Sequence, residues 1–321
     1  MLPLEFQPLL KQIRWGGRRL EQLGKQLGQA NDYAESWELA DHGDDQTHVI
    51  GGEYDGWSLE RLVRERNDAL LGRHAGRSQF PLLVKFLDAN DRLSLQVHPN
   101  DEQARGYDPK ENGKTEAWVI VHADPGSRLY AGLQPGVTPE QLRETSLAGE
   151  VEPLLHSFEV APGECVFIPA GTVHAIGEGI MLAEIQQMSN LTFRLYDWGR
   201  LGADGQPREI HIEQSIACTD FQRGPVNPEA PKRTEHESGV TDQLVRCEQF
   251  EMRRHVLEED FRMEPEDRFR ILVALDGTGD LVAGDAAMRF PLGRTILVPA
   301  AAPAVTIHPL REMTVLEAVL P

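Results

Sequence analysis

Short apolar runs separated by glycine and proline most strongly limit the folds open to this chain of 321 residues. The runs are about four to eight residues long, as strands usually are, and 29 glycines and 21 prolines divide the sequence between them. Many short strands with few helices between them favour a sandwich or barrel over a parallel sheet with crossover helices. We therefore expect an all-β-dominated fold. The runs include PLLVKFLDA, LSLQVHP, EAWVIVHA, CVFIPAG, ILVALDG, TILVPAA and MTVLEAVL.

A few helices are expected as small insertions into this β framework. Ser58 is a suitable N-cap for an apolar pattern with helical spacing. Thr138 is followed by a proline and then, three positions on, by Gln141, which together form the start signal of a capped helix. The expected helical segments are 58–71, 138–155 and a short one at 209–217.

The sequence predicts two lobes joined by a linker. Residues 221–240 are polar, rich in proline and without periodicity, as linkers often are. We expect a larger lobe over 1–220 and a smaller one over 241–321.

Two segments of the chain resemble each other, one in each predicted lobe. GECVFIPAGTVHAI begins at Gly163 and GRTILVPAAAPAVTI begins at Gly293, and in both a proline follows six positions later. His174 in the first segment corresponds to Ala304 in the second. We interpret the pair as one strand–turn–strand unit used twice, with its histidine lost in the second copy, although two β segments can also match by chance.

The charge of the chain excludes several classes of partner. Asp and Glu number 51 and Lys and Arg 32, so the formal net charge is −19. Such a surface repels nucleic acid and anionic membranes, and an anionic substrate would need cations placed locally in its site. No signal peptide, apolar run of about 18 residues or paired cysteine motif is evident, so we expect a cytoplasmic protein without a membrane partner. The sequence leaves the oligomeric state open.

Four polar side chains are candidates for a metal site. Gln96 and His98 lie two apart in an apolar strand and so point to the same face. Glu116 begins a second apolar strand, and His174 follows a proline–glycine turn at the start of a third. Buried polar groups of this kind need a compensating partner, and imidazole, carboxylate and amide oxygen together suit zinc. Taken singly, His98 could instead be a hydrogen-bonded core residue and Glu116 a solvated one at the rim of its strand.

Several separate motifs give the chain a family resemblance. QVHPND, GKTEAW, FIPAGTVHAIG and EIQQMSNLTFRLYDWGR follow one another in this order, with WGG, LVKFLDA and REIHIEQ elsewhere in residues 10–220. In these motifs the chain resembles the type I mannose-6-phosphate isomerases. The resemblance implies two cupin (jelly-roll) lobes, one zinc ion per chain and a sugar-phosphate substrate, with interconversion of mannose 6-phosphate and fructose 6-phosphate.

The resemblance also implies roles for individual residues. The zinc ligands of the family fall on the same four candidates, and its catalytic arginine falls on Arg194. Lys85 and Lys114 lie in motifs that line the family's cleft, which makes them candidates for binding substrate. Many members have aspartate where this chain has Asn190, so an acid–base role is uncertain there and Glu184 becomes a candidate for it.

This reaction moves a proton between adjacent carbons through an enediolate. It needs a base and a stabiliser of negative charge, for which a zinc ion and Arg194 are suited, with lysines expected at the rim to hold phosphate. The sequence identifies neither the base nor the group that opens the sugar ring. Two alternatives are a metal-dependent cupin oxygenase and a non-catalytic sugar-binding cupin.

Overall fold

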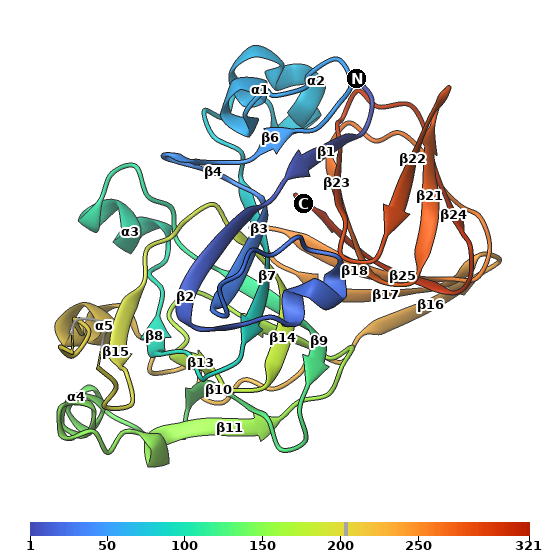
Figure 1. Cartoon of the computed structure of the whole chain (residues 1–321). Helices are drawn as coiled ribbons and strands as arrows, with labels where there is room; N and C mark the ends of the chain where they lie inside the picture. The colour runs from blue at the N-terminus through green and yellow to red at the C-terminus, as the bar shows by residue number, and fades with distance from the viewer. Residues whose placement is uncertain (202–204) are drawn as a thin grey trace.

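The described strands form four larger antiparallel β-sheets, stacked in layers, and one two-stranded pair, with short helices at the edges (Figure 1). The computed structural model describes residues 1–201 and 205–321. No helix in the described part of the chain has the length and apolar character needed to cross a membrane. The predicted all-β-dominated class is confirmed, and the paired sheets are consistent with a cupin fold.

The first lobe contains a five-stranded and a six-stranded sheet. In sheet order, the five strands are β11 (Leu155–Glu159), β10 (Arg128–Leu133), β13 (His174–Ile176), β8 (Leu95–Val97) and β15 (Phe193–Tyr196). The six strands are β12 (Cys165–Ile168), β9 (Glu116–Ala123), β14 (Ile180–Gln187), β7 (Leu82–Ala89), β3 (Tyr33–Leu39) and β2 (Leu9–Gly17).

The second lobe contains an eight-stranded and a four-stranded sheet. The eight strands are β16 (Lys232–His236), β17 (Gly239–Arg246), β18 (Glu251–Leu257), β25 (Met313–Val319), β20 (Arg270–Asp276), β23 (Thr295–Val298), β1 (Leu4–Gln7) and β6 (His48–Val49). The four strands are β19 (Phe261–Met263), β24 (Val305–Pro309), β21 (Thr278–Ala283) and β22 (Ala286–Pro291). A separate pair is formed by β4 (Asp41–His42) and β5 (Asp45–Gln46).

The helices are short, and three of the described α-helices begin at side-chain caps, at Ser58, Asn100 and Thr138. Arg61 N–H donates to the Ser58 side chain, and Thr138 forms a capping box with Gln141, so both predicted helix starts are observed. The second of these helices is shorter than the predicted 138–155, because Gly149 adopts a left-handed conformation and ends it. The elements are α1 (Leu59–Glu65), α2 (Asn67–Leu71), α3 (Asp101–Tyr107), α4 (Pro139–Ala148), α5 (Ile212–Cys218), and the 3-10 turns η1 (Arg19–Leu23), η2 (Gly72–His74) and η3 (Glu152–Leu154).

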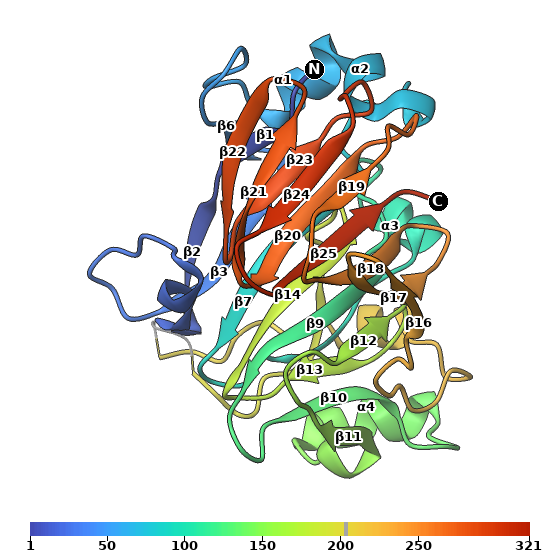
Figure 2. The same ribbon diagram turned by 90° about the vertical axis from the view of Figure 1, so that its right-hand side faces the viewer.

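Three apolar interiors separate the four layers. One lies between the five- and six-stranded sheets, one between the eight- and four-stranded sheets, and the largest between the two middle sheets. Strands β22, β21 and β24 of the four-stranded sheet run side by side in Figure 2. Strand β20 shows how these interiors arise: Ile271 and Val273 pack toward the first lobe, whereas Leu272 and Ala274 face the inside of the second. Since successive side chains of a strand point to opposite faces, the central part of such a strand is apolar on both faces.

The lobes are joined by more than a linker. Strand β1, at the start of the chain, pairs with β23, and β16 lies inside the segment 221–240 that the sequence suggested as linker. The proposed division into 1–220 and 241–321 then needs β1, β6 and β16 added to the sheet of the second lobe.

The two similar segments fold in the same way. Strands β12 and β23 begin and end 130 residues apart, at Cys165–Ile168 and Thr295–Val298. In each copy a turn with a proline follows, and then β13 or β24 begins. His174 opens β13, whereas Ala304 stands just before β24. The repeat therefore places the two residues at matching corners of the two lobes.

We predict that Phe269→Ala lowers the free energy of unfolding by about 3–5 kcal/mol. Phe269 is fully buried, and its ring centroid lies 4.9 Å from that of Phe80, in the interior between the lobes. Urea unfolding would measure the change. Leu310→Ala is the control, because Leu310 is 57% exposed and should shift stability by less than about 0.5 kcal/mol. A loss below about 1 kcal/mol in Phe269→Ala would show that the two lobes do not depend on this packing.

Candidate metal centre and active site

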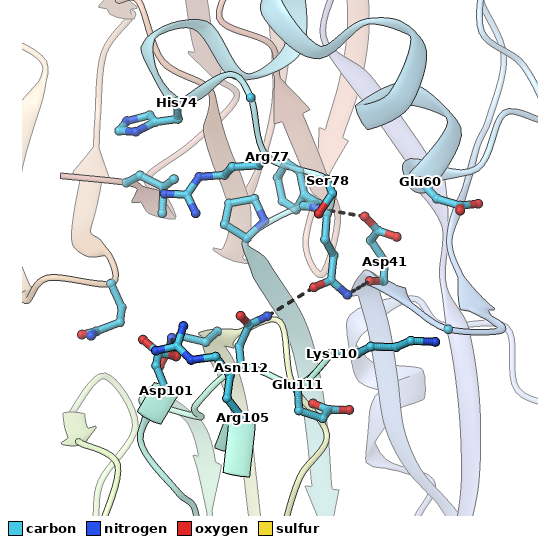
Figure 3. Close-up of a pocket in the computed structure, with 18 of the residues that line it drawn as sticks. Asp41, Glu60, His74, Arg77, Ser78, Asp101, Arg105, Lys110, Glu111 and Asn112 are labelled. Carbon is cyan, nitrogen blue, oxygen red and sulfur yellow. Dashed lines mark hydrogen bonds between the residues drawn. The ribbon is translucent and has the colours of Figure 1, made fainter. Parts of the chain in front are cut away.

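Two gatherings of polar side chains among the described residues are relevant to the candidate site. One is a cavity of about 1160 Å³, whose wall includes Asp101 of α3, the loop residues Glu111 and Asn112, and Gln187 (Figure 3). None of the candidate site residues lines it. The other place lies between the two sheets of the first lobe, where the candidates meet.

Strand pairing brings three candidates to one face of the five-stranded sheet. Gln96 on β8 is directly opposite His174 on β13 and also opposite Arg194 on β15. Side chains of directly paired residues project on the same side of a sheet. The apolar neighbours Leu95 and Val97 point the other way, into the interior beneath α4 and α5. The polar row therefore faces the six-stranded sheet.

The six-stranded sheet contributes the facing row. Glu184 on β14 is paired with Lys85 on β7 and with Trp118 on β9, so these three side chains share a face. Glu116 lies two residues before Trp118 and therefore points the same way.

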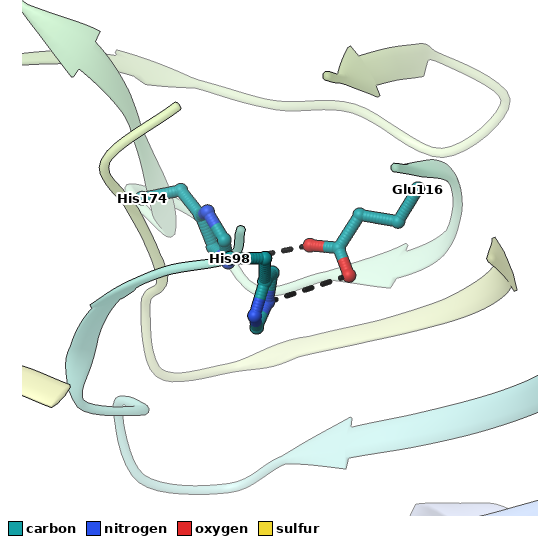
Figure 4. A group of neighbouring side chains, drawn as sticks. All are labelled: His98, Glu116 and His174. Carbon is teal, nitrogen blue, oxygen red and sulfur yellow. Dashed lines mark ion pairs between the residues drawn. The ribbon is translucent and has the colours of Figure 1, made fainter. Parts of the chain in front are cut away.

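His98, Glu116 and His174 form a compact buried cluster (Figure 4). The three residues are each no more than 1% exposed, and one ligand atom from each lies within 4.8 Å of the others. His174 Nε2 is 3.2 Å from Glu116 Oε1, and His98 Nε2 is 3.6 Å from Glu116 Oε2. Within the described residues no other group of three His, Cys, Asp or Glu side chains meets in this way.

Backbone carbonyls orient both imidazoles. His98 Nδ1 lies 3.0 Å from the Leu191 carbonyl oxygen, and His174 Nδ1 lies 2.9 Å from that of Thr172. A carbonyl only accepts, so Nδ1 carries the proton and Nε2 presents a lone pair. Burial also lowers the pKa of His98 well below its usual value and that of His174 to about 4, which keeps both rings neutral.

These donors fit a metal ion. Glu116 Oε1 is buried without a hydrogen-bond donor, and the Nε2 lone pair of His174 faces it. Facing lone pairs repel each other, and a cation between them removes the repulsion. Neutral imidazoles and a carboxylate are ligands that zinc accepts, and separations near 3.2–3.6 Å match ligands about 2.0–2.1 Å from one ion. The three residues could therefore hold a metal.

Gln96 completes this arrangement. Its Nε2 lies 3.2 Å from His174 Nε2. The two ends of an amide are alike in shape, and rotation of the amide would direct its oxygen to the same place. Gln96 is thus positioned beside the cluster as the fourth candidate ligand.

The two lysines lie inside the site, and the expectation that they stand at its rim is wrong. Lys114 and Lys85 are 5% and 4% exposed. Lys114 Nζ is 2.7 Å from Glu116 Oε2 and 3.0 Å from His98 Nε2. Burial would lower the pKa of Lys114, but the negative charges of Glu116 and Glu184 outweigh burial and raise it. Lys114 is therefore a fixed positive charge among the candidate ligands.

Glu184 is held as a carboxylate by its neighbours. Trp118 Nε1 donates to it at 2.9 Å, and Lys85 Nζ lies 3.6 Å from Glu184 and 3.6 Å from Glu35. Burial alone would raise the pKa of Glu184, but the two lysine charges and the tryptophan hydrogen bond outweigh it, so the pKa is lowered. Glu184 is thus a buried anion next to the candidate metal ligands.

Arg194 is half-buried on the same face as Gln96. Its Nη1 donates to the Glu209 carbonyl at 2.7 Å, and its Nε has no partner among the described residues. Its backbone N–H donates to His211 Nδ1 at 3.1 Å, so His211 helps fix the strand that carries the guanidinium.

Charged residues inside the second lobe are paired with one another. Glu317 is 2% exposed and accepts from Arg270 Nη1 at 2.5 Å, while Arg253 and His255 each lie 3.2 Å from its other oxygen. Burial would raise the pKa of Glu317, but these partners outweigh it and the pKa is lowered. The charge of Glu317 is therefore already balanced by side chains of the second lobe, without a metal ion.

Glu35 and Trp118 belong to the site but did not stand out in the sequence. Trp118 lies two residues after Glu116, which in a strand means the same face. Glu35 lies on β3, which also carries Ser36 and Glu38, and its partner Lys85 is a cation in the largely apolar strand β7. The sequence shows both residues, but only the pairing of distant strands places them next to Lys85 and Glu184.

Comparison with known proteins agrees with this geometry. Residues 4–116 match the family described as phosphomannose isomerase type I, catalytic domain. The chain is 35% identical to mannose-6-phosphate isomerase ManA of Bacillus subtilis (strain 168) over 302 residues, which cover 92% of this chain and 93% of the relative. It is 34% identical to mannose-6-phosphate isomerase of Streptococcus mutans over 285 residues, 88% of this chain and 87% of the relative.

A solved structure shows the same fold over the full length. The crystal structure of the mannose 6-phosphate isomerase from Bacillus subtilis superposes with a TM-score of 0.92 at 26% sequence identity and covers 99% of both chains. Sequence similarity, fold and the buried cluster point the same way, and the chain belongs to the type I mannose-6-phosphate isomerase family.

Proposed function

We propose that this enzyme interconverts mannose 6-phosphate and fructose 6-phosphate with one zinc ion held by Gln96, His98, Glu116 and His174. The observation that carries the proposal is the buried cluster, in which two neutral imidazoles direct Nε2 at one carboxylate. A sugar-binding protein has no need of such an arrangement. Membership in the isomerase family supports this function over an oxygenase.

When bound, zinc would supply a Lewis acid that polarises the sugar carbonyl. Glu184 is the proposed base that moves a proton between the two adjacent carbons, through an enediol(ate). Its lowered pKa keeps it ionised at neutral pH, and its two lysine neighbours balance its charge. Asn190, which is exposed, has no acidic proton to exchange, so it does not compete for this role.

Arg194 is proposed to stabilise the negative charge that develops on the substrate oxygen. A guanidinium stays charged at any working pH, so it suits charge stabilisation better than proton transfer. Its Nε–H is buried and has no hydrogen-bond partner among the described residues. Lys85 and Lys114 offer positive charge to an anionic sugar phosphate against the −19 background of the chain.

The second lobe is proposed to be catalytically silent. Ala304 replaces the histidine of the matching corner, and Glu317 is already paired with two arginines and a histidine. Its role is then to cover the apolar face of the six-stranded sheet. The cytoplasmic location stays a prediction from sequence.

We predict about one zinc per chain in the purified protein, and loss of both zinc and activity in His174→Ala. Removing one of the ligands leaves an incomplete set that binds the ion weakly. Elemental analysis would measure zinc, and a coupled assay would follow fructose 6-phosphate formed from mannose 6-phosphate. His122→Ala is the matched control, because His122 also contacts a carboxylate, Asp124 at 2.9 Å, but lies outside the cluster. Full zinc content in His174→Ala would contradict the ligand assignment, and absence of isomerase activity in the zinc-loaded protein would contradict the function.

We predict that Arg194→Ala keeps its zinc but loses about 10²–10³-fold in turnover. The lost interaction is with charge that develops during reaction, so the rate at saturating substrate should fall. Steady-state kinetics would measure this, with Arg143→Ala as control because Arg143 pairs with Glu213 on the helical surface. Weak substrate binding with normal turnover would instead place Arg194 in phosphate binding.

A further inference from the structure

A chain of hydrogen bonds runs from the wall of the 1160 Å³ cavity to the metal-cluster residue His98. Ser189 Oγ donates to Glu111 Oε2 at 2.9 Å and accepts from the Leu191 backbone N–H at 3.2 Å. The Leu191 carbonyl in turn accepts from His98 Nδ1 at 3.0 Å. Glu111 lies on the cavity wall, next to Asn112 (Figure 3).

Further hydrogen bonds hold Glu111 and the turn at Ser189 in place. Glu111 Oε1 lies 2.8 Å from His42 Nε2, which holds the carboxylate from the side opposite Ser189. Gln186, the last residue but one of β14, donates its amide to the Ser189 carbonyl at 2.7 Å. The turn that carries Ser189 and Leu191 is therefore held both by its own strand and by Glu111.

The two histidines of the cluster differ in how they are oriented. His174 bonds to the carbonyl of Thr172, two residues away, so its own turn sets its tautomer. His98 depends on Leu191, which is 93 residues away in sequence. The Leu191 carbonyl can orient the His98 ring only if the turn that carries it is held in place. Glu111 and Ser189 hold this turn.

We propose that Glu111 and Ser189 are positioning residues for His98. They fix the Leu191 carbonyl, which keeps the proton on Nδ1 and directs the Nε2 lone pair toward Glu116. The proposal rests on the proposed metal site and extends it to a layer of residues that do not touch the ion. Outer partners of this kind commonly change metal affinity about 10–100-fold when removed.

We predict that Ser189→Ala and Glu111→Ala each weaken zinc binding about 10–100-fold. Competition with a chelator would measure zinc affinity in the full-length protein. Because the two residues act through one chain, the double variant should lose no more than the larger single loss. Ser189→Thr keeps the hydroxyl and should restore affinity close to that of the unaltered protein. Glu60→Ala is the matched control, because Glu60 lines the same cavity but makes no side-chain contact with this chain of bonds.

A second readout separates positioning from general stability. Zinc should raise the melting temperature of the unaltered protein, and that rise should shrink in Ser189→Ala and in Glu111→Gln, which keeps the size of the side chain. Melting temperatures lowered equally with and without zinc, at unchanged affinity, would overturn the proposal.

The outcomes also separate this proposal from the one on which it rests. Suppose that the unaltered protein binds zinc, that His174→Ala loses it and that Ser189→Ala binds it normally. This result would overturn the positioning role of Ser189 and leave the metal site standing. If the losses of zinc affinity in the two single variants multiply in the double variant, Glu111 and Ser189 act independently. That result would contradict a single shared chain of hydrogen bonds. Absence of zinc binding in the unaltered protein would overturn the metal site and the positioning role together.

Discussion

The buried carboxylate of Glu116 is the interaction on which the rest of the site depends. A bare anion between two sheets is several kcal/mol less stable than in water, so positive charge must come close to it. Lys114 supplies one such charge at 2.7 Å, and the geometry of His98 and His174 prepares a place for a second. Because burial keeps both imidazoles neutral, they can offer lone pairs to an ion and cannot themselves neutralise the carboxylate.

The same principle explains the neighbouring charges. Glu184, also buried, is balanced by Lys85 and stabilised by Trp118, so anions and cations alternate across the six-stranded sheet. Burial raises the pKa of Glu116 to about 8, although the Lys114 charge beside it opposes that rise, whereas the pKa of Glu184 is lowered. The lysines thus lie within the site, where the low dielectric strengthens their electrostatic interactions. Local positive charge of this kind offsets the repulsion of anions by a chain with a net charge of −19.

The four-layer fold keeps the two faces of this site in place. The six-stranded sheet is covered by the site on one side and by the second lobe on the other, and an apolar interior joins the middle layers. Strand β1 strengthens this arrangement, because it pairs with β23 although it begins the chain. The second lobe packs against the six-stranded sheet, and the buried carboxylate of Glu317 is paired within that lobe.

The sequence by itself determined the β class, the caps at Ser58 and Thr138, and the four candidate ligands, because each depends on local patterns of two to four residues. It also determined the family, through motifs that keep their order along the chain. Only the tertiary structure decided which distant strands pair: that Lys85 meets Glu35 and Glu184 in the interior, that β1 joins the second lobe, and that Leu191 orients His98. Such contacts join residues up to 293 positions apart, as Leu4 and Leu297 are, and strand periodicity carries no information about the partner of a strand, since every register of pairing preserves the same alternation.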